Sequence, residues 1–282
     1  MAVWTLQTGL KILDLLAPDR RQPLRRTLDL RDEELARWHD MTRRMHLVVH
    51  GDGIISQFEG YEDLEEFNWE GYRQKYRDIQ RLDRVLEAEQ DTPNRHKVSK
   101  QADVLMLFYF FSADELRAVF EQLSYPFTYK TILRNVGYYL RRTSHGSTLS
   151  RIVHSWGLAR SDRTHSWRLC TEALESDIRD TRGGTTPEGI HLGAMVGSVD
   201  LVQRCYCGIE MRDEVLWRHP CLPADVRRLE LQIRYCSHWL TVEVSHEALR
   251  VTSRQGWAKT ARVGFRNQVY EFEAGDVREF VL

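Results

Sequence analysis

The hydrophobic pattern of this chain changes period once, and that change limits the folds that it can adopt. From residue 2 to about 207, apolar residues recur every three or four positions, as they do along one face of a helix. From residue 229 onward, apolar and polar residues alternate, which is typical of half-buried strands. Pro220 and Pro223 lie between the two regions. The sequence therefore predicts a mainly α fold, with a helical domain over residues 1–217 and a small C-terminal β-sheet domain over residues 218–282.

Within the helical region, amphipathic segments follow one another through short loops. This arrangement favours an array of α-hairpins. The sequence shows no repeat of fixed period, so a consensus solenoid is not expected. The predicted helices span residues 2–17, 33–49, 73–89, 98–111, 113–123, 129–142, 148–160, 163–178 and 189–206. The predicted strands span residues 229–235, 240–244, 249–251, 263–265, 269–272 and 277–281.

Composition excludes several classes of protein. The chain has 40 Lys and Arg against 41 Asp and Glu, a formal net charge of −1, so no overall field attracts nucleic acid or an anionic membrane. Its longest apolar run, Val104–Phe111, is much shorter than the roughly 20 residues that span a bilayer. The first residues lack the pattern of a secretory signal, and the five cysteines are an odd number. We therefore expect a soluble cytoplasmic protein with reduced thiols and with no nucleic-acid or membrane partner.

Residues 141–150, Arg-Arg-Thr-Ser-His-Gly-Ser-Thr-Leu-Ser, join two predicted helices and carry many hydrogen-bond donors. Ser147 suits the N-cap of the following helix, whose free amides point into the loop. Gly146 allows a positive φ or a close approach of the backbone to a ligand. This chemistry fits a phosphate or oxyanion site, although an ordinary capped turn would use the same residue types. The candidate phosphate-binding residues are Ser144, His145, Gly146, Ser147 and Thr148.

Two other segments carry candidate binding residues. Lys100 and Gln101 lie at the start of the most apolar predicted helix. There they could face a pocket and bind sugar hydroxyls or an anion, or they could be solvated at a helix end. His191 lies one turn inside a predicted helix rich in small residues, which permit close helix packing or leave room for a ligand. His191 itself is either a ligand contact or a satisfied core histidine.

The loop over residues 51–63 mixes carboxylates with aromatic side chains. Carbohydrate sites use both groups, but acidic loops are also commonly just solvated. The cysteines do not support a metal site, because Cys205 and Cys207 form a C-x-C with no second pair at zinc spacing. The sequence also lacks a P-loop, a dinucleotide-binding fingerprint and a G-x-S-x-G nucleophile elbow.

The chain resembles glycoside hydrolase family 65, which contains the maltose, trehalose and kojibiose phosphorylases. The likeness lies in these four segments, which follow one another along the chain in the order and at the spacing of the family. The likeness continues into the C-terminal region, where the family has a small sheet domain. It therefore covers nearly the whole chain. The matching stretches are Asp52–Tyr61, Lys100–Asp103, Thr143–Ser150 and Gly189–His191, together with Met195 and Gly197.

The resemblance implies part of an (α/α)6 barrel and an inverting glycoside phosphorylase. Such an enzyme cleaves an α-linked glucose disaccharide with phosphate to give β-glucose 1-phosphate and glucose. It implies inorganic phosphate as co-substrate and no other cofactor, with Ser144–Thr148 and His191 around the phosphate. Lys100 and Gln101 match positions that hold the sugar at the cleaved bond. The loop has no carboxylate to serve as a base for water, which favours phosphorolysis over hydrolysis within the family.

One departure from the family pattern limits what we expect of this chain. In the family, the general-acid glutamate and a tryptophan–aspartate pair that grips the sugar precede the segment that corresponds to residues 2–17. We therefore expect the C-terminal half of the barrel plus the terminal sheet, with little phosphorylase activity on maltose, trehalose or kojibiose from the chain alone. The alternative is an inactive or split-chain fragment that binds phosphate or sugar, as a homodimer or beside a chain that supplies the missing barrel half. The retained carboxylates considered as substitutes for the acid are Asp52, Glu59 and Glu188.

Overall fold

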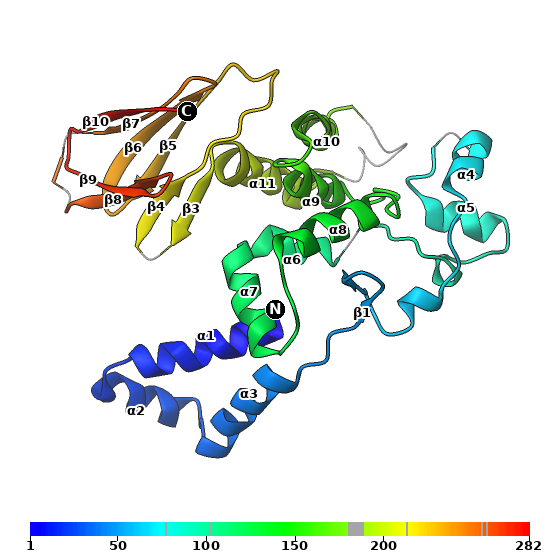
Figure 1. The fold of residues 1–282 in the computed structure, drawn as a ribbon, viewed down its shortest axis with the longest axis horizontal. Coiled ribbons are helices and arrows are strands. Elements are labelled where there is room, and N and C mark those ends of the chain that lie inside the picture. Colours follow the sequence, from blue (N-terminus) through cyan, green and yellow to red (C-terminus); the bar gives the residue numbers. More distant parts are fainter. Residues whose placement is uncertain (77, 102, 180–188, 213, 255, 258) are drawn as a thin grey trace. The chain divides into compact units, whose positions relative to one another are not determined.

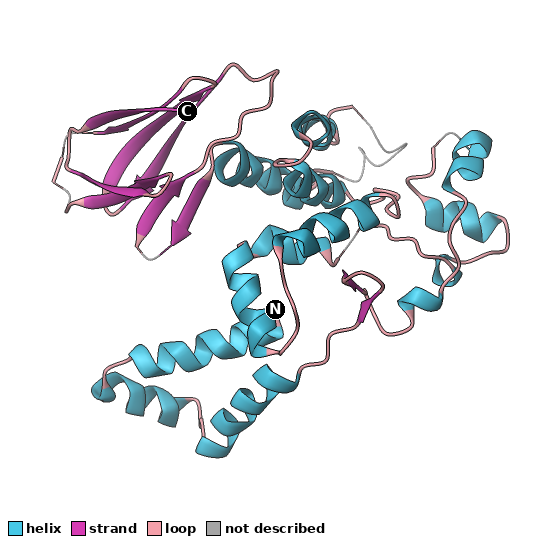
Figure 2. Ribbon diagram, in the orientation of Figure 1, coloured by secondary structure: helices cyan, strands magenta, loops and turns pink. Residues whose placement is uncertain are grey.

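Helices make up most of the N-terminal part of the chain and strands most of the C-terminal part (Figure 2). The structure, a computed structural model, describes residues 1–76, 78–101, 103–179, 189–212, 214–254, 256–257 and 259–282. It divides into two compact units, whose helices and strands are labelled in Figure 1. The first unit contains Met1–Arg77 and Asp83–Thr143, and the second contains Asp78–Leu82 and Ser144–Leu282.

The first unit is built from helices, one short hairpin and irregular loops. Its α-helices, of which α5 begins with a residue of the second unit, are α1 (Ala2–Leu15), α2 (Pro18–Thr27), α3 (Asp32–Arg44), α4 (Trp69–Tyr76), α5 (Leu82–Ala88), α6 (Leu105–Phe110), α7 (Ala113–Gln122) and α8 (Tyr129–Leu140). The shorter elements are β1 (Val49–His50), β2 (Ile54–Ile55) and the 3-10 turns η1 (Tyr61–Asp63) and η2 (Pro93–Arg95). α1 packs against α3, and the centroids of the Trp4 and Phe111 rings lie 5.6 Å apart.

Three of the helix predictions are corrected in this unit, the first being the helix over residues 33–49, which ends at Arg44 as α3, so that Val49 lies in β1. The predicted helix over residues 73–89 is two helices, α4 and α5, and the one over 98–111 is confined to α6. The first helix ends at Leu15, before Pro18, but this proline also begins α2, which the sequence analysis did not predict. Proline suits the first turn of a helix because its missing N–H would have no helical partner there.

The helices of the second unit are α9 (Thr148–Leu158), α10 (Arg163–Glu175), α11 (Leu192–Asp200) and the π-helical turn η4 (Leu201–Tyr206). α9 packs against both α10 and α11. Buried hydroxyls join α9 to α10, because Ser155 Oγ donates to the Ser166 carbonyl at 2.7 Å and Ser166 Oγ donates to the Ser155 carbonyl at 2.8 Å. The predicted helix over 189–206 begins later, at Leu192, and ends as η4. Residues 180–188 lie outside the described residues.

The small residues of α11 serve close helix packing, which is one of the two interpretations that the sequence left open. Ala194, Gly197 and Ser198 are buried. A Cβ atom built at Gly197 would lie 2.9 Å from Ile152 Cγ2 on α9, closer than carbon atoms approach in proteins. The glycine therefore lets α9 and α11 approach each other.

Two glycine substitutions on α11 test this packing. Gly197→Ala is expected to lower the free energy of unfolding by about 1–3 kcal/mol, because the added methyl overlaps Ile152. Gly193→Ala lies in the same helix with open space around its Cβ, and it is expected to raise the free energy of unfolding by about 0.5–1 kcal/mol. Urea denaturation of both variants measures the difference, and equal effects of the two would contradict the packing.

The strands of the second unit form two four-stranded sheets, with the orders β10-β7-β6-β5 and β3-β4-β8-β9. They are β3 (Ile209–Arg212), β4 (Val215–Arg218), β5 (Arg228–Tyr235), β6 (His238–Ser245), β7 (Ala248–Ser253), β8 (Ala261–Phe265), β9 (Gln268–Phe272) and β10 (Val277–Val281). Alternation decides which side chains face inward, as on β6, where Leu240, Val242 and Val244 are buried. The rings of Phe265 on β8 and Phe280 on β10 lie 4.9 Å apart, so the two sheets share apolar contacts.

All six predicted strands are present, as β5 to β10. The sequence analysis did not predict β3 and β4, which lie within residues 209–218 and join the second sheet through the parallel pair of β4 and β8. Their short length and their mixed burial leave little alternation to detect. The domain boundary between residues 217 and 218 stays a prediction.

Two further findings concern the chain as a whole. Among the helices in the described ranges, none has both the length and the apolar character needed to cross a membrane. The five cysteines are free thiols, and all except Cys236 are buried.

Candidate functional site

The predicted phosphate loop leads into the N-terminus of α9. Thr148 is the first residue of that helix and is buried, and Ser147 is its N-cap residue, as predicted. The Ser147 side chain makes no capping hydrogen bond, so it does not occupy the first amides of α9. A helix N-terminus with such amides attracts anions, because the backbone dipoles add up to a partial positive charge there.

His145 takes the strained backbone position of this loop. Its φ is 56°, in the left-handed region, so the residue before Gly146 makes the turn for which the sequence analysis proposed the glycine. His145 Nδ1 lies 3.0 Å from Ser150 Oγ, and its ring packs edge-on against His154 at 4.6 Å between centroids. His154 is buried and its Nδ1–H donates to the Ser150 carbonyl at 2.9 Å. These contacts hold the imidazole of His145 beside the first turn of α9.

Ser144 is held from a different part of the second unit. Its Oγ donates to the backbone carbonyl of Gln80 at 3.4 Å. The sequence analysis gave Gln80 no role, because 64 residues separate it from Ser144.

His191 is paired with an aspartate that the sequence analysis missed. It is the N-cap residue of α11 and not a residue one turn inside the helix, as predicted. Its backbone N–H donates to Asp177 Oδ2 at 2.9 Å, and its Nδ1 lies 2.6 Å from Asp177 Oδ1. The His191 side chain is 24% exposed, so it is not a fully buried core histidine. Asp177 fixes the orientation of the ring and favours the tautomer that carries its proton on Nδ1.

Lys100 and Gln101 lie in the first unit, in the turn that precedes α6 and not at a helix start as predicted. Lys100 is exposed, and Gln101 Nε2 donates to Asp103 Oδ1 at 3.2 Å. Ala102, the third residue of the Lys100–Asp103 stretch, lies outside the described residues. The loop before the motif is anchored, because the Ser99 N–H donates to the Arg142 carbonyl at 2.8 Å.

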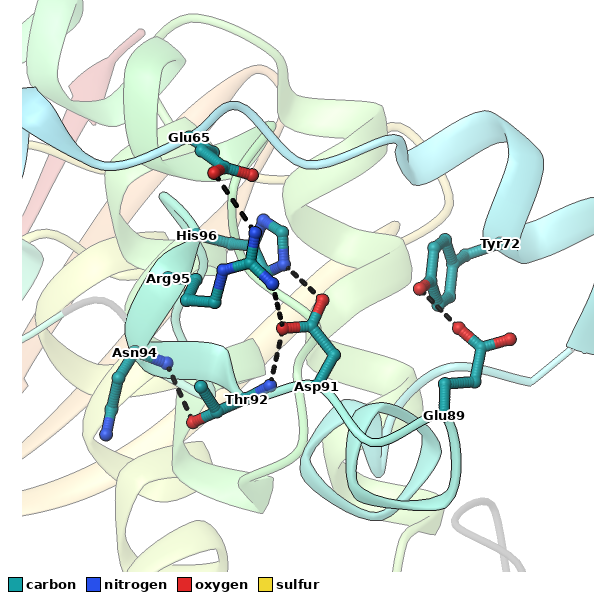
Figure 3. A network of polar contacts seen from close by, with 8 residues as sticks. All are labelled: Glu65, Tyr72, Glu89, Asp91, Thr92, Asn94, Arg95 and His96. Carbon is teal, nitrogen blue, oxygen red and sulfur yellow. Dashed lines mark hydrogen bonds and ion pairs between the residues drawn. The ribbon is translucent and has the colours of Figure 1, made fainter.

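A second set of contacts anchors the segment that leads to Lys100 (Figure 3). His96 Nε2 lies 2.8 Å from Asp91 Oδ2, and this contact is the main reason that the pKa of Asp91 is below its usual value. Arg95 bridges Asp91 and Glu65, with nitrogen–oxygen distances of 3.3 and 3.2 Å. The Lys97 N–H donates to the Glu65 carbonyl at 2.7 Å. Backbone and side-chain contacts together therefore fix the chain up to Ser99.

Glu89 lies in the same region and gathers three donors. Lys75 Nζ and the hydroxyls of Tyr72 and Tyr76 all contact its carboxylate, and Figure 3 shows the Tyr72 contact. The hydrogen bond from Lys75 is the largest reason that the pKa of Glu89 falls to about 2, followed by the two tyrosines. The same carboxylate raises the pKa of Tyr72 to about 12. This cluster joins α4 to the chain just after α5.

The acidic and aromatic loop over residues 51–63 is only partly available to a ligand. Asp52, Glu59 and Phe58 are exposed, whereas Tyr61 is buried. An open hollow of about 470 Å³ adjoins the loop. Its lining residues are Asp52, Ile54, Leu133, Arg134, Gly137, Tyr138 and Arg141. Glu188, the third carboxylate considered as a substitute acid, lies outside the described residues.

The sites predicted from sequence fall into both units. The phosphate loop and His191 belong to the second unit, and Lys100 and Gln101 belong to the first. Arg142, one of two arginines before the loop, forms an ion pair with Glu66 at 2.8 Å and lies over the Tyr138 ring. Among the described residues, no group of three or more His, Cys, Asp or Glu side chains is arranged to hold a metal ion.

Comparisons with known proteins identify the family of this chain. The family model described as "Glycosyl hydrolase family 65 central catalytic domain" matches residues 1–200. The model described as "Glycosyl hydrolase family 65, C-terminal domain" matches residues 209–271. An uncharacterized glycosyl hydrolase of Mycobacterium tuberculosis is 46% identical over 279 residues, which cover 99% of this chain and 21% of that protein. Trehalose 6-phosphate phosphorylase of Lactococcus lactis is 33% identical over 199 residues, which cover 70% of this chain and 26% of that protein.

A solved structure shares the fold. It is that of a candidate kojibiose phosphorylase from the human microbiome, with a TM-score of 0.75 and 20% sequence identity, and the match covers 99% of this chain and 38% of that one. The likeness confirms the predicted fold class, part of an (α/α)6 barrel followed by a small C-terminal β-sheet region. The chain spans 21% and 26% of the length of the two curated relatives. The two family matches and the 46% identity show that this chain belongs to glycosyl hydrolase family 65.

Proposed function

We propose that this chain forms the phosphate-binding part of an inverting glycoside phosphorylase that acts on an α-linked glucose disaccharide. The observation that carries the proposal is the loop before α9, where hydroxyls and an imidazole lie beside the first amides of the helix. Two of the proteins that this chain resembles are named as phosphorylases, one of trehalose 6-phosphate and the other of kojibiose, which supports the same kind of reaction.

The composition of the loop fits phosphorolysis better than hydrolysis. An inverting hydrolase needs a carboxylate base to activate water on the face opposite the leaving group. Phosphate is already anionic and needs no base, and the loop from Ser144 to Thr148 contains no carboxylate. In the proposed reaction, an oxygen of hydrogen phosphate bonds to the anomeric carbon as the glycosidic bond breaks, and the leaving oxygen takes up a proton that, in the overall balance, hydrogen phosphate loses. The products are β-glucose 1-phosphate and glucose.

The remaining candidate residues have separate roles in this proposal. With Nδ1–H donating to Asp177, the Nε2 atom of His191 is an acceptor in the neutral ring, so it would accept a hydrogen bond from the P–OH group of hydrogen phosphate. Lys100 and Gln101 would hold the sugar at the cleaved bond, because their ammonium and amide groups bond sugar oxygens. The proposal includes inorganic phosphate as co-substrate, no other cofactor, and either a homodimer or a further polypeptide segment that completes the barrel.

Phosphate binding by the 282-residue chain tests the proposal. We expect measurable heat of binding in a calorimetric titration with inorganic phosphate at low ionic strength. Ser147→Ala and His145→Ala are each expected to weaken the affinity by about 5- to 50-fold, because each removes a hydrogen bond to a charged ligand.

A serine at the other end of the same helix provides the control. Ser161 follows α9 and donates to the Leu158 carbonyl at 3.3 Å, so Ser161→Ala is expected to leave the phosphate affinity unchanged. Equal affinity in the wild type and in both loop variants would remove the phosphate site from this loop.

A further inference from the structure

Arg151 is a buried arginine near the start of α9 that the sequence analysis did not single out. The residue is 4% exposed. Its Nε donates to Glu172 Oε2 on α10 at 3.1 Å, and its Nη2 donates to Gln80 Oε1 at 3.1 Å. The remaining nitrogen, Nη1, is also buried, and it forms no hydrogen bond with the described residues.

Gln80 connects this guanidinium to the phosphate loop. Its backbone carbonyl accepts the hydrogen bond of Ser144 Oγ, while its side-chain oxygen accepts that of Arg151. Side chains on a helix lean toward the N-terminus, so Arg151, the fourth residue of α9, extends toward the end that Ser147 caps. Arg151, Gln80 and Ser144 therefore form a continuous chain of contacts from α9 to the loop.

The positive charge of Arg151 is only partly neutralised by its surroundings. A guanidinium stays charged in proteins, and a buried charge is costly unless it is paired and hydrogen-bonded. Glu172, the carboxylate that Nε contacts, has 42% of its side chain exposed, so water screens its charge. A buried guanidinium with an unused donor therefore favours additional negative charge in its neighbourhood.

We propose that Arg151 is a positioning residue of the phosphate site. It holds Ser144 in place through Gln80, and it adds a full positive charge behind the N-terminus of α9, where the helix itself supplies only about half a charge. The ligand that this charge favours is inorganic phosphate. The inference rests on the proposed function, since it assigns a further residue to the same site.

Calorimetric titration of the 282-residue chain with inorganic phosphate tests this role. Arg151→Met removes the charge at similar side-chain length, and it is expected to weaken phosphate binding by about 10-fold or more. Arg151→Lys keeps the positive charge but lacks the planar guanidinium that reaches two partners. It is expected to bind phosphate more tightly than the methionine variant. Arg168→Met is the matched control, because Arg168 is an exposed arginine on α10. The phosphate affinity of this variant is expected to equal that of the wild type.

Glu172→Gln distinguishes the charge of Arg151 from its packing. The amide keeps an oxygen acceptor for Nε but removes the countercharge, so phosphate binding is expected to tighten by about threefold or more. Structural damage would not tighten binding. If circular dichroism shows that Arg151→Met does not fold, Glu172→Gln still tests whether the charge of Arg151 favours phosphate binding.

The outcomes separate the two proposals. If the wild type binds phosphate and both Arg151→Met and Glu172→Gln bind it equally well, the positioning role of Arg151 is wrong and the proposed function stands. If the wild type does not bind phosphate, the proposed function is wrong, and the role of Arg151 falls with it.

Discussion

Replacing Phe272 by alanine is expected to lower the free energy of unfolding of the second unit by about 3–5 kcal/mol. Phe272 ends β9, is fully buried, and pairs across the sheet with the buried Ala261 on β8. Truncation leaves a cavity in place of the ring, and neighbouring side chains on a paired strand have little freedom to fill it. Arg278 also loses the ring over which its guanidinium lies, 5.2 Å from the centroid.

The same strand supplies the control for this prediction. Val269 on β9 is 41% exposed, so Val269→Ala removes methyl groups that are largely in contact with water. Its expected cost is below about 1 kcal/mol. Calorimetric melting of the two variants beside the wild type measures the difference, and a Phe272→Ala cost no larger than that of Val269→Ala would mean that this ring is not part of the core.

Replacing Asn135 by leucine is expected to lower the stability of the first unit by about 2–4 kcal/mol. Asn135 lies on α8, is fully buried, and holds the β1–β2 hairpin through both ends of its amide. Its Oδ1 accepts the Ile55 N–H at 2.9 Å, and its Nδ2 donates to the Gly53 carbonyl at 3.0 Å. Leucine has a similar size but leaves these two backbone groups without their partner.

Hydrogen exchange at Ile55 gives the prediction a local readout. Loss of the Asn135 acceptor is expected to speed exchange of the Ile55 amide well before the unit unfolds. Lys130→Leu, at an exposed position of the same helix, is expected to change stability by no more than about 0.5 kcal/mol and to leave this exchange rate unchanged. Unchanged Ile55 exchange in Asn135→Leu would show that another group holds the hairpin.

Asn135 also illustrates why sequence reasoning could not describe the surroundings of the loop over residues 51–63. The loop was recognised from its mixture of carboxylates and aromatic residues. Its anchor is an asparagine 80 residues further along the chain, in the middle of an amphipathic helix, where nothing in the pattern distinguishes it from a solvated side chain. Tyr139, on the same helix, donates to the Ile55 carbonyl at 2.6 Å and is equally hidden in the pattern.

Around the candidate phosphate site, too, sequence reasoning found some of the residues and missed others. The donors of the loop lie next to one another in sequence, so their chemistry was visible as a motif. Gln80, Asp177 and Arg151 were missed, because each gains its meaning from a partner that is distant in sequence. Asp177 is 14 residues from His191, and Arg151 is 71 residues from Gln80.

The sequence by itself determined the kind of element at most positions and the family of the chain. Hydrophobic periodicity is a local property, so it predicted all six strands from β5 to β10 and the helices from α7 to α10. It failed where the local signal is short or interrupted, as at β3, β4 and the break between α4 and α5. Tertiary structure alone decided which polar groups are paired, because a hydrogen bond depends on the approach of segments whose order in the sequence does not reveal their distance in space.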